Sequence, residues 1–202
     1  MRIGIDFDNT IACYDDLFKS ELKKTGLISN FWEGSKKELK KLVLSQKNGE
    51  KKWQKIQGIV YGPEMKKARL FPGLALFLLR CKLRKADIFI VSHKTKFGHY
   101  DPSRTLLREV ALKWMSSKGF FNKNVFGLSK KRIFFATTRK EKIKQIIKLK
   151  LDLFIDDLEE VFAENDFPNI RRILFSSCFN IKYHDLICNN WTNISYEILG
   201  PI

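Results

Sequence analysis

Five short apolar segments alternate with helix-like segments along this chain, and that alternation limits the possible folds more than any other feature. Each segment has the length and composition of a β-strand, and the second is apolar enough to be buried on both faces of a sheet. The segments read RIGID (2–6), ADIFIVS (86–92), RIFFA (132–136), LDLFIDD (151–157) and RRILFSS (171–177).

The segments between these strands have helical patterns. GLALFLLRCKL at 73–83 predicts a buried helix, and KEKIKQIIKLK at 140–150 predicts a basic amphipathic helix. DPSRTLLREVALKWMSSKG at 101–119 predicts a helix that Asp101 caps, with Pro102 in its first turn. Strands that alternate with helices form parallel sheets covered by helices. We therefore expect an α/β fold, a Rossmann-like parallel sheet of about five strands with helices on both faces.

One long segment interrupts this alternation directly after the first strand. Residues 14–72 have a helical pattern, and Ser35 followed by Glu38 is typical of a capping box at a helix start. We expect these residues to form a small helical insert, and residues 1–13 and 73–202 to form the α/β core. The insert is either a packing appendage or a lid at the carboxyl edge of the sheet, and we favour the lid.

Basic residues dominate the first three quarters of the chain. The 202 residues include 38 Lys and Arg against 22 Asp and Glu, a formal net charge of +16. Residues 151–202 hold three basic and nine acidic residues, so residues 1–150 carry +22. Such an excess attracts nucleic acid or other anionic partners, including a phosphorylated substrate. It also arises from genomic base composition alone, which is the interpretation that we favour.

Composition and cysteine spacing indicate a cytoplasmic globular protein. Hydrophobic residues make up 44% of the chain, but no run approaches the roughly 18 apolar residues of a membrane span. A strand follows the first methionine almost at once, which leaves no room for a signal peptide. The cysteines show no C-x-x-C spacing, so neither zinc nor a redox motif is expected. We expect reduced thiols, a cytoplasmic location and no membrane partner.

Two aspartates follow the first strand at a spacing that needs an explanation. Asp6 and Asp8 lie two positions apart, so in extended backbone their carboxylates point to the same side. Like charges held this close disfavour joint ionisation unless a cation or a shared proton relieves them. We therefore expect a cation or a mobile proton at this end of the strand.

Polar residues suited to such chemistry follow four of the predicted strands. Because the carboxyl ends of parallel strands meet at the edge where open α/β sheets bind ligands, we expect these residues to lie together. An aspartate pair after a strand also occurs as a turn or a helix cap, but that explanation does not account for all four groups. The groups are Asp6, Asp8 and Thr10; Ser92; Lys142; and Asp156 with Asp157.

The lysine assignment has alternatives on the same helix. Lys140 and Lys144 compete with Lys142, since all three are close to the helix start. We prefer Lys142 because the buried face of this helix should leave it pointing along the site. That buried face is expected to consist of Ile143, Ile146 and Ile147.

These motifs together resemble the haloacid dehalogenase (HAD) superfamily, in which phosphatases predominate. The resemblance extends from residue 3 to about 160, and the insert at 14–72 falls where that superfamily places its C1 cap. DFDNT is similar to the D-x-D-x-T signature, FIVSHKT to the second motif, TTRKEKI to the lysine motif and LFIDD to the acidic fourth motif.

The resemblance implies a chemical task for each acidic residue. Asp6 would be the nucleophile that forms an aspartyl-phosphate, and Asp8 would be the general acid and base. The cofactor would be Mg²⁺, held by the side chain of Asp6, the backbone carbonyl of Asp8, and Asp156 or Asp157. Either of the last two aspartates is a candidate for the direct ligand.

The resemblance also implies phosphate-binding residues. Ser92 would bond a phosphoryl oxygen, Lys142 would offset its charge, and Thr10 would steady the turn after the nucleophile. His93 and Lys94 follow Ser92 and are candidates for contact with substrate, although a structural role for His93 is equally consistent with the sequence.

Three functions are consistent with these residues. The first is a Mg²⁺-dependent phosphatase for a small phosphomonoester such as a sugar phosphate or nucleotide, and we favour it. The second is a phosphatase for nucleic-acid ends, which the basic insert favours but the lack of basic-aromatic alternation disfavours. The third is a catalytically silent basic binding module. The sequence assigns neither an oligomeric state nor a role for residues 177–202.

Overall fold

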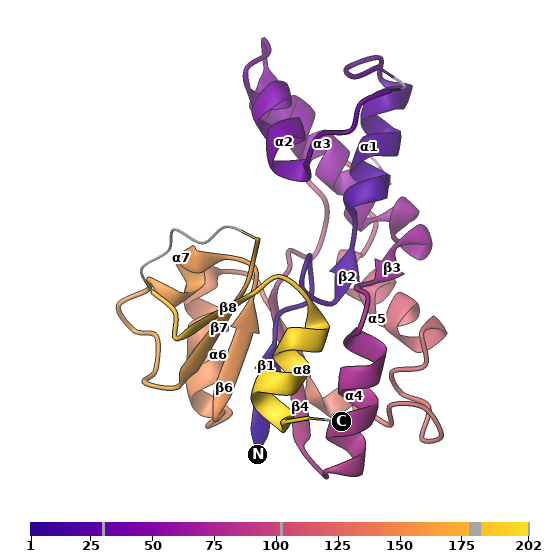
Figure 1. Ribbon diagram of the computed structural model, residues 1–202. Helices are drawn as coiled ribbons and strands as arrows, with labels where there is room; N and C mark the ends of the chain where they lie inside the picture. The colour runs from indigo at the N-terminus through magenta and orange to yellow at the C-terminus, as the bar shows by residue number, and fades with distance from the viewer. Residues whose placement is uncertain (30, 102, 178–182, 202) are drawn as a thin grey trace. The chain divides into compact units, whose positions relative to one another are not determined.

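The chain folds into two compact units, seen in the computed structural model in Figure 1. The structure describes residues 1–29, 31–101, 103–177 and 183–201. We name the units by their composition. The core unit comprises 1–12, 70–94 and 115–202, and the helical unit comprises 13–69 and 95–114. The expected boundaries differ from this division at 13 and 95–114, which the sequence placed in the core, and at 70–72, which it placed in the insert.

The core unit is built on a six-stranded parallel sheet with the strand order β5-β4-β1-β6-β7-β8. One of the two central strands is β1, in which Ile3 pairs with Leu153 and Ile5 with Ile90. The strands are β1 (Arg2–Ile5), β4 (Asp87–His93), β5 (Ile133–Ala136), β6 (Leu153–Asp156), β7 (Arg171–Phe175) and β8 (Leu186–Cys188). The predicted α/β fold with a parallel sheet is confirmed, and the sixth strand is additional.

Helices cover both faces of this sheet. On one face, Phe89, Val91 and Phe154 form a buried cluster with Ile143 and Ile146 of α6. On the other face α4 and α8 lie side by side (Figure 1), and Trp191 packs on Phe77 and Phe175 with ring centroids 5.0 and 5.7 Å away. The helices are α4 (Leu74–Leu83), α6 (Arg139–Lys148), α7 (Glu159–Phe162) and α8 (Trp191–Leu199), with a 3₁₀ turn at Lys130–Arg132.

The expected burial of α4 is only partly correct. Leu74, Phe77 and Leu78 are buried, but Leu76 and Leu83 are 48% and 82% exposed. A helix on the outside of a two-faced sheet needs only one apolar side. The continuous apolar run therefore overstated how much of this helix is covered.

The helical unit contains α1, α2 and α3, as the pattern of the insert predicts. The capping box is confirmed, because the Ser35 N–H donates to Glu38 at 2.7 Å and the Glu38 N–H donates to Ser35 Oγ at 3.3 Å. In the core of this unit the rings of Phe18 and Trp53 stack with centroids 4.9 Å apart. The helices are α1 (Asp15–Lys24), α2 (Lys36–Leu44) and α3 (Gly49–Tyr61), followed by a 3₁₀ turn at Pro63–Lys67.

The remaining elements lie where the chain passes between the units. β2 (Ala12–Cys13) and β3 (Arg69–Leu70) form a separate two-stranded sheet. The longest helix in the described part of the chain, α3, has 13 residues, and no helix there is long and apolar enough to cross a membrane.

Helix α5 (Leu107–Ser117) begins later than the sequence predicts. The carboxylate of Asp101 accepts hydrogen bonds from the N–H groups of Ser103 and Thr105, at 3.0 and 2.7 Å, and so closes a loop instead of capping a helix. Arg104 has a φ of 49°, which a right-handed helix excludes. The expected Pro102 in the first turn lies outside the described residues.

Candidate active site

A tight turn follows β1 and holds the first acidic motif at the carboxyl edge of the sheet. The Asp6 N–H still donates to the Ile155 carbonyl at 2.8 Å, so the strand pairing reaches this residue. The carbonyl of Phe7 then accepts two backbone N–H groups from residues further along, each at 3.0 Å. Asn9 has a φ of 61°, the left-handed conformation that asparagine tolerates. The chain therefore reverses around Asp8 instead of continuing as extended backbone.

The Asp6 carboxylate shares a buried lysine with Asp156. Lys142 Nζ donates to Asp6 Oδ1 at 2.5 Å and to Asp156 Oδ2 at 2.6 Å. All three residues are at most 5% exposed. A lysine ammonium is almost never buried this deeply unless carboxylates pair with it. Lys142 is thus a cation that Asp6 and Asp156 share.

Helix α6 places Lys142, of the three candidate lysines, in this position. The Thr138 hydroxyl caps the helix by accepting the Glu141 N–H at 3.1 Å, which fixes where the first turn begins. Lys140 and Lys144 are exposed, on the side of the helix away from the core. The expected buried face is correct at Ile143 and Ile146 but wrong at Ile147, which is 46% exposed.

The Asp8 carboxylate has a separate lysine partner. Lys94 Nζ donates to both Asp8 oxygens, at 2.9 and 2.7 Å, and Lys94 is only 3% exposed. Its backbone N–H donates to the Ala136 carbonyl at 2.9 Å, which keeps the chain in register with β5 past the end of β4. The two aspartates of the motif therefore do not share one cation, because each has its own buried lysine.

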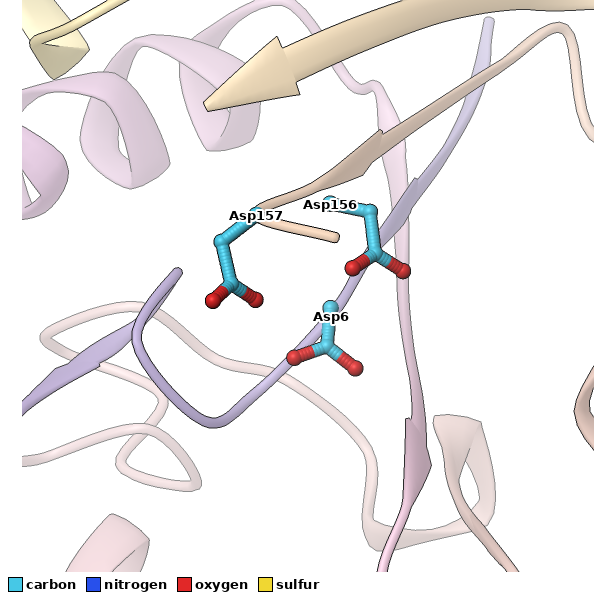
Figure 2. A group of neighbouring side chains, drawn as sticks. All are labelled: Asp6, Asp156 and Asp157. Atoms are coloured by element: carbon cyan, nitrogen blue, oxygen red, sulfur yellow. The ribbon is translucent and has the colours of Figure 1, made fainter. Parts of the chain in front are cut away.

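Three carboxylates converge at this edge of the sheet. Figure 2 shows Asp6 at the end of β1, with Asp156 and Asp157 at the end of β6. One oxygen from each lies within 4.8 Å of the other two. The Leu158 N–H donates to Asp156 Oδ1 at 3.0 Å, and the Thr10 hydroxyl lies 3.4 Å from Asp157 Oδ1. These contacts orient the carboxylates toward a common space.

This donor set fits a divalent cation with oxygen ligands. Asp6, Asp8, Asp156 and Asp157 provide four negative charges, and the two lysines offset two of them. Lys142 uses one oxygen of Asp6 and one of Asp156, so each keeps its second oxygen for other contacts. Mg²⁺ prefers carboxylate oxygens and keeps several waters, which a cluster of three carboxylates allows. Coordination by the Asp8 carbonyl stays a prediction.

Burial and charge shift the ionisation of this cluster. Burial raises the pKa of Asp6 to about 7, although Lys142 opposes the shift and Asp156 adds to it. Burial alone lowers the pKa of Lys142, but the carboxylates of Asp156 and Asp6 outweigh that effect and raise it. The lysine therefore stays charged, while Asp6 gains and loses its proton near neutral pH.

The raised pKa of Asp6 predicts a pH-dependent stability difference. The pKa of Asp6 is 3.8, the ordinary value for aspartate, in the unfolded chain and about 7 in the folded chain. The free energy of unfolding of the metal-free protein therefore falls as the pH rises from about 4 to about 7. In EDTA, the melting temperature of Asp6→Asn minus that of the wild type should grow from pH 5 to 7 and level off above. Asp166→Asn, an exposed control, should show no trend, and a flat Asp6→Asn difference would contradict the shift.

In the second motif, Ser92 is buried and the next residue, His93, is exposed. Ser92 is 1% exposed and lies two residues beyond Ile90, the partner of Ile5, so it belongs to the same sheet edge as Asp6. His93 Nε2 lies 2.8 Å from the carbonyl oxygen of Thr137, and its side chain is exposed. The structure gives His93 a contact with the end of β5, not with the carboxylates.

Sequence analysis missed one residue that contacts the acidic motif. Trp191 of α8 is fully buried, and its Nε1–H donates to the Thr10 carbonyl at 2.9 Å across 181 positions of the chain. Trp191 belongs to residues 177–202, to which the sequence assigned no role. No motif or periodicity could have located its partner, because the contact depends on how α8 packs on the sheet.

Trp191→Phe is expected to destabilise the core unit by about 1–3 kcal/mol, because the buried Thr10 carbonyl loses its donor. Urea unfolding followed by circular dichroism would measure the loss. Trp32→Phe makes the same chemical change and is the control, since Trp32 Nε1 has no hydrogen-bond partner among the described residues. Equal losses in the two variants would show that ring size, and not the hydrogen bond, sets the cost.

Comparison with known proteins identifies the fold but not a close relative. No family model matches the sequence, and no curated protein matches it either. A haloacid dehalogenase-like hydrolase from Streptococcus pneumoniae has a TM-score of 0.59 at 14% identity, covering 98% of this chain and 97% of its own. A HAD-superfamily hydrolase from Ehrlichia chaffeensis has a TM-score of 0.54 at 17% identity, with 98% and 95% covered. A predicted phosphoglycolate phosphatase from Haemophilus somnus has a TM-score of 0.54 at 14% identity, and the match covers 97% of this chain and 96% of that protein. The chain thus has the fold of HAD-superfamily hydrolases.

Proposed function

We propose that this chain is a Mg²⁺-dependent phosphatase that hydrolyses a small phosphomonoester through a phosphorylated Asp6. The observation that carries the proposal is the cluster of Asp6, Asp156 and Asp157, in which buried Lys142 pairs with Asp6 and Asp156. The site has four carboxylates, with that of Asp8 included, and only two buried lysines. Purely structural ion pairs would need only one carboxylate for each lysine. The fold shared with HAD-superfamily hydrolases, including a predicted phosphoglycolate phosphatase, supports the same reaction class.

In the first proposed step, the Asp6 oxygen that Lys142 leaves open attacks phosphorus. The phosphorus bond to the leaving oxygen breaks as the new bond to Asp6 forms, and Asp8 donates the proton that the leaving oxygen needs. Lys142 and Ser92 would bind phosphoryl oxygens. Asp6, Asp156 and Asp157 would hold Mg²⁺, which neutralises charge on the transferring group when bound.

In the second proposed step, Asp8 takes a proton from water and the resulting hydroxide attacks the phosphorylated Asp6. The phosphorus bond to Asp6 breaks, which frees inorganic phosphate and restores the carboxylate. Lys94 would orient Asp8 as the base of this step, since it donates to both oxygens of the ionised carboxylate. The cap role of the insert and the cytoplasmic location stay predictions.

Phosphate release from a substrate panel tests the proposal. The panel contains sugar phosphates, nucleotides and oligonucleotides with a 3′- or 5′-phosphate, each assayed in Mg²⁺ and in EDTA. We expect turnover that requires Mg²⁺ and that Asp6→Asn abolishes, since the amide has the same shape but is not a nucleophile. Turnover that survives this substitution, or that EDTA leaves unchanged, would contradict the proposal.

A further inference from the structure

The helical unit holds more than its share of the positive charge. It contains 18 of the 38 Lys and Arg and 9 of the 22 Asp and Glu, so its 77 residues carry +9. The other 125 residues carry +7. Genomic base composition alone predicts an even spread of this excess over the chain. The observed excess is uneven.

Part of this charge lies where α3 meets the loop at 95–105, both within the helical unit. Lys51 Nζ lies 5.2 Å from the ring centroid of Tyr100, and a Cβ on Gly58 would lie only 3.1 Å from the His99 carbonyl. Lys51 and Gly58 are seven positions apart, so the face of α3 that contains both lies toward the loop. Lys55 lies on that face between them, and its side chain is exposed.

The same loop contains a second ring with cations beside it. The Arg104 guanidinium lies 4.7 Å and Lys96 Nζ 5.3 Å from the ring centroid of Phe97. We call the set the basic-aromatic surface. It consists of Lys51, Lys55, Lys96, Phe97, Tyr100 and Arg104, and its four basic side chains are exposed.

The loop that carries this surface is held in a costly conformation. Tyr100 and Arg104 have φ values of 56° and 49°, and such left-handed residues cluster at functional sites when they are not glycine. The Asp101 carboxylate is directed to the N–H groups of Ser103 and Thr105, at 3.0 and 2.7 Å. Its negative charge is thus satisfied within the loop, and the basic side chains around it remain in excess.

We propose that the basic-aromatic surface binds single-stranded nucleic acid. Exposed cations beside aromatic rings are the combination that binds phosphates and stacks bases at once. Tyr100 is 54% exposed, so a base can reach its ring. Duplex bases are already stacked, and lipid headgroups would use the cations but not the rings. The sequence concealed this arrangement because Lys51 and Tyr100 come from separate segments.

The proposal is independent of the phosphatase chemistry, and the test keeps the two apart. Fluorescence anisotropy would measure binding of a labelled 20-nucleotide DNA strand without terminal phosphates to the full wild-type chain, at 50 and 200 mM salt. We expect binding that weakens with salt, and a loss of at least roughly fivefold in Tyr100→Ala. Tyr100→Phe should keep most of the affinity because it keeps the ring.

A charge-matched pair of variants separates this surface from general attraction. Lys51→Ala with Lys96→Ala should weaken binding at least roughly tenfold at the lower salt. Lys37→Ala with Lys40→Ala removes the same charge from exposed positions on α2 and should change it less than about twofold. Equal losses in the two double variants, no binding at 50 mM salt, or binding to anionic phosphatidylserine vesicles but not to the DNA would each overturn the proposal. Melting curves would confirm that every variant is folded.

Discussion

Lys142→Met is expected to destabilise the chain by about 3–5 kcal/mol, because it leaves buried carboxylates without their cation. Asp6 and Asp156 lie 2.5 and 2.6 Å from the lysine nitrogen, and neither is more than 5% exposed. Methionine fills similar space but has no charge, so the carboxylates must take up protons or draw in water. Urea unfolding at pH 8 would measure the loss, and protonation should make the loss smaller at pH 5.

Lys144→Met is the control for this substitution. It makes the same chemical change two positions along the same helix, at an exposed residue, and should alter stability by less than about 0.5 kcal/mol. Mg²⁺ should raise the melting temperature of Lys142→Met, since the three carboxylates that remain attract a divalent cation more strongly. If both variants unfold alike, the buried lysine does not compensate the carboxylates.

That the site residues meet at one edge of the sheet was predictable, because it follows from the α/β fold. Parallel strands bring their carboxyl ends to one edge, so the residues after β1, β4 and β6 meet whatever their exact contacts. Lys142 was predictable for a similar reason, since helical periodicity places it beside Ile143 and Ile146. The error at Ile147 arose because periodicity gives the centre of a buried face but not its width.

Contacts that depend on packing could not be predicted in this way. The sequence placed Lys94 near substrate, but its side chain reaches Asp8 only because the chain turns sharply after Phe7. The strand at Leu186–Cys188 is three residues long, too short for a recognisable pattern, and it forms because β7 offers an open edge. Trp191 contacts Thr10 through a backbone carbonyl, which every residue has.

Local hydrogen bonds also explain why the helix expected to start at Asp101 does not start there. Asp101 followed by a proline is typical of a helix start, yet its carboxylate bonds the N–H groups of Ser103 and Thr105 and closes a loop. Aspartate suits both roles, because its short side chain satisfies either a helix end or a turn. The expected helix included Arg104, which in the structure lies in this loop beside the ring of Phe97.

Asp8→Asn is expected to separate the two proposed steps of hydrolysis. Loss of the general acid should lower kcat roughly 10²- to 10⁴-fold on an alkyl phosphate, whose leaving oxygen needs a proton. An aryl phosphate such as p-nitrophenyl phosphate has a leaving group that departs without one. This substrate should therefore still phosphorylate Asp6 and release one nitrophenolate per chain in a burst. Later turnovers should be slow, because no base activates the water that hydrolyses the phosphorylated Asp6. Rapid mixing with absorbance detection would measure the burst.

The burst experiment needs a variant that allows for the buried charge on Lys94. Asp8→Asn alone leaves that ammonium without the carboxylate that holds it at 2.7 and 2.9 Å. The double variant Asp8→Asn with Lys94→Met removes both charges, so it should regain stability while keeping the burst and the slow second step. If neither variant shows a burst although both are folded and bind Mg²⁺, Asp8 does more than transfer protons. If both turn over the alkyl phosphate at the wild-type rate, another group is the general acid.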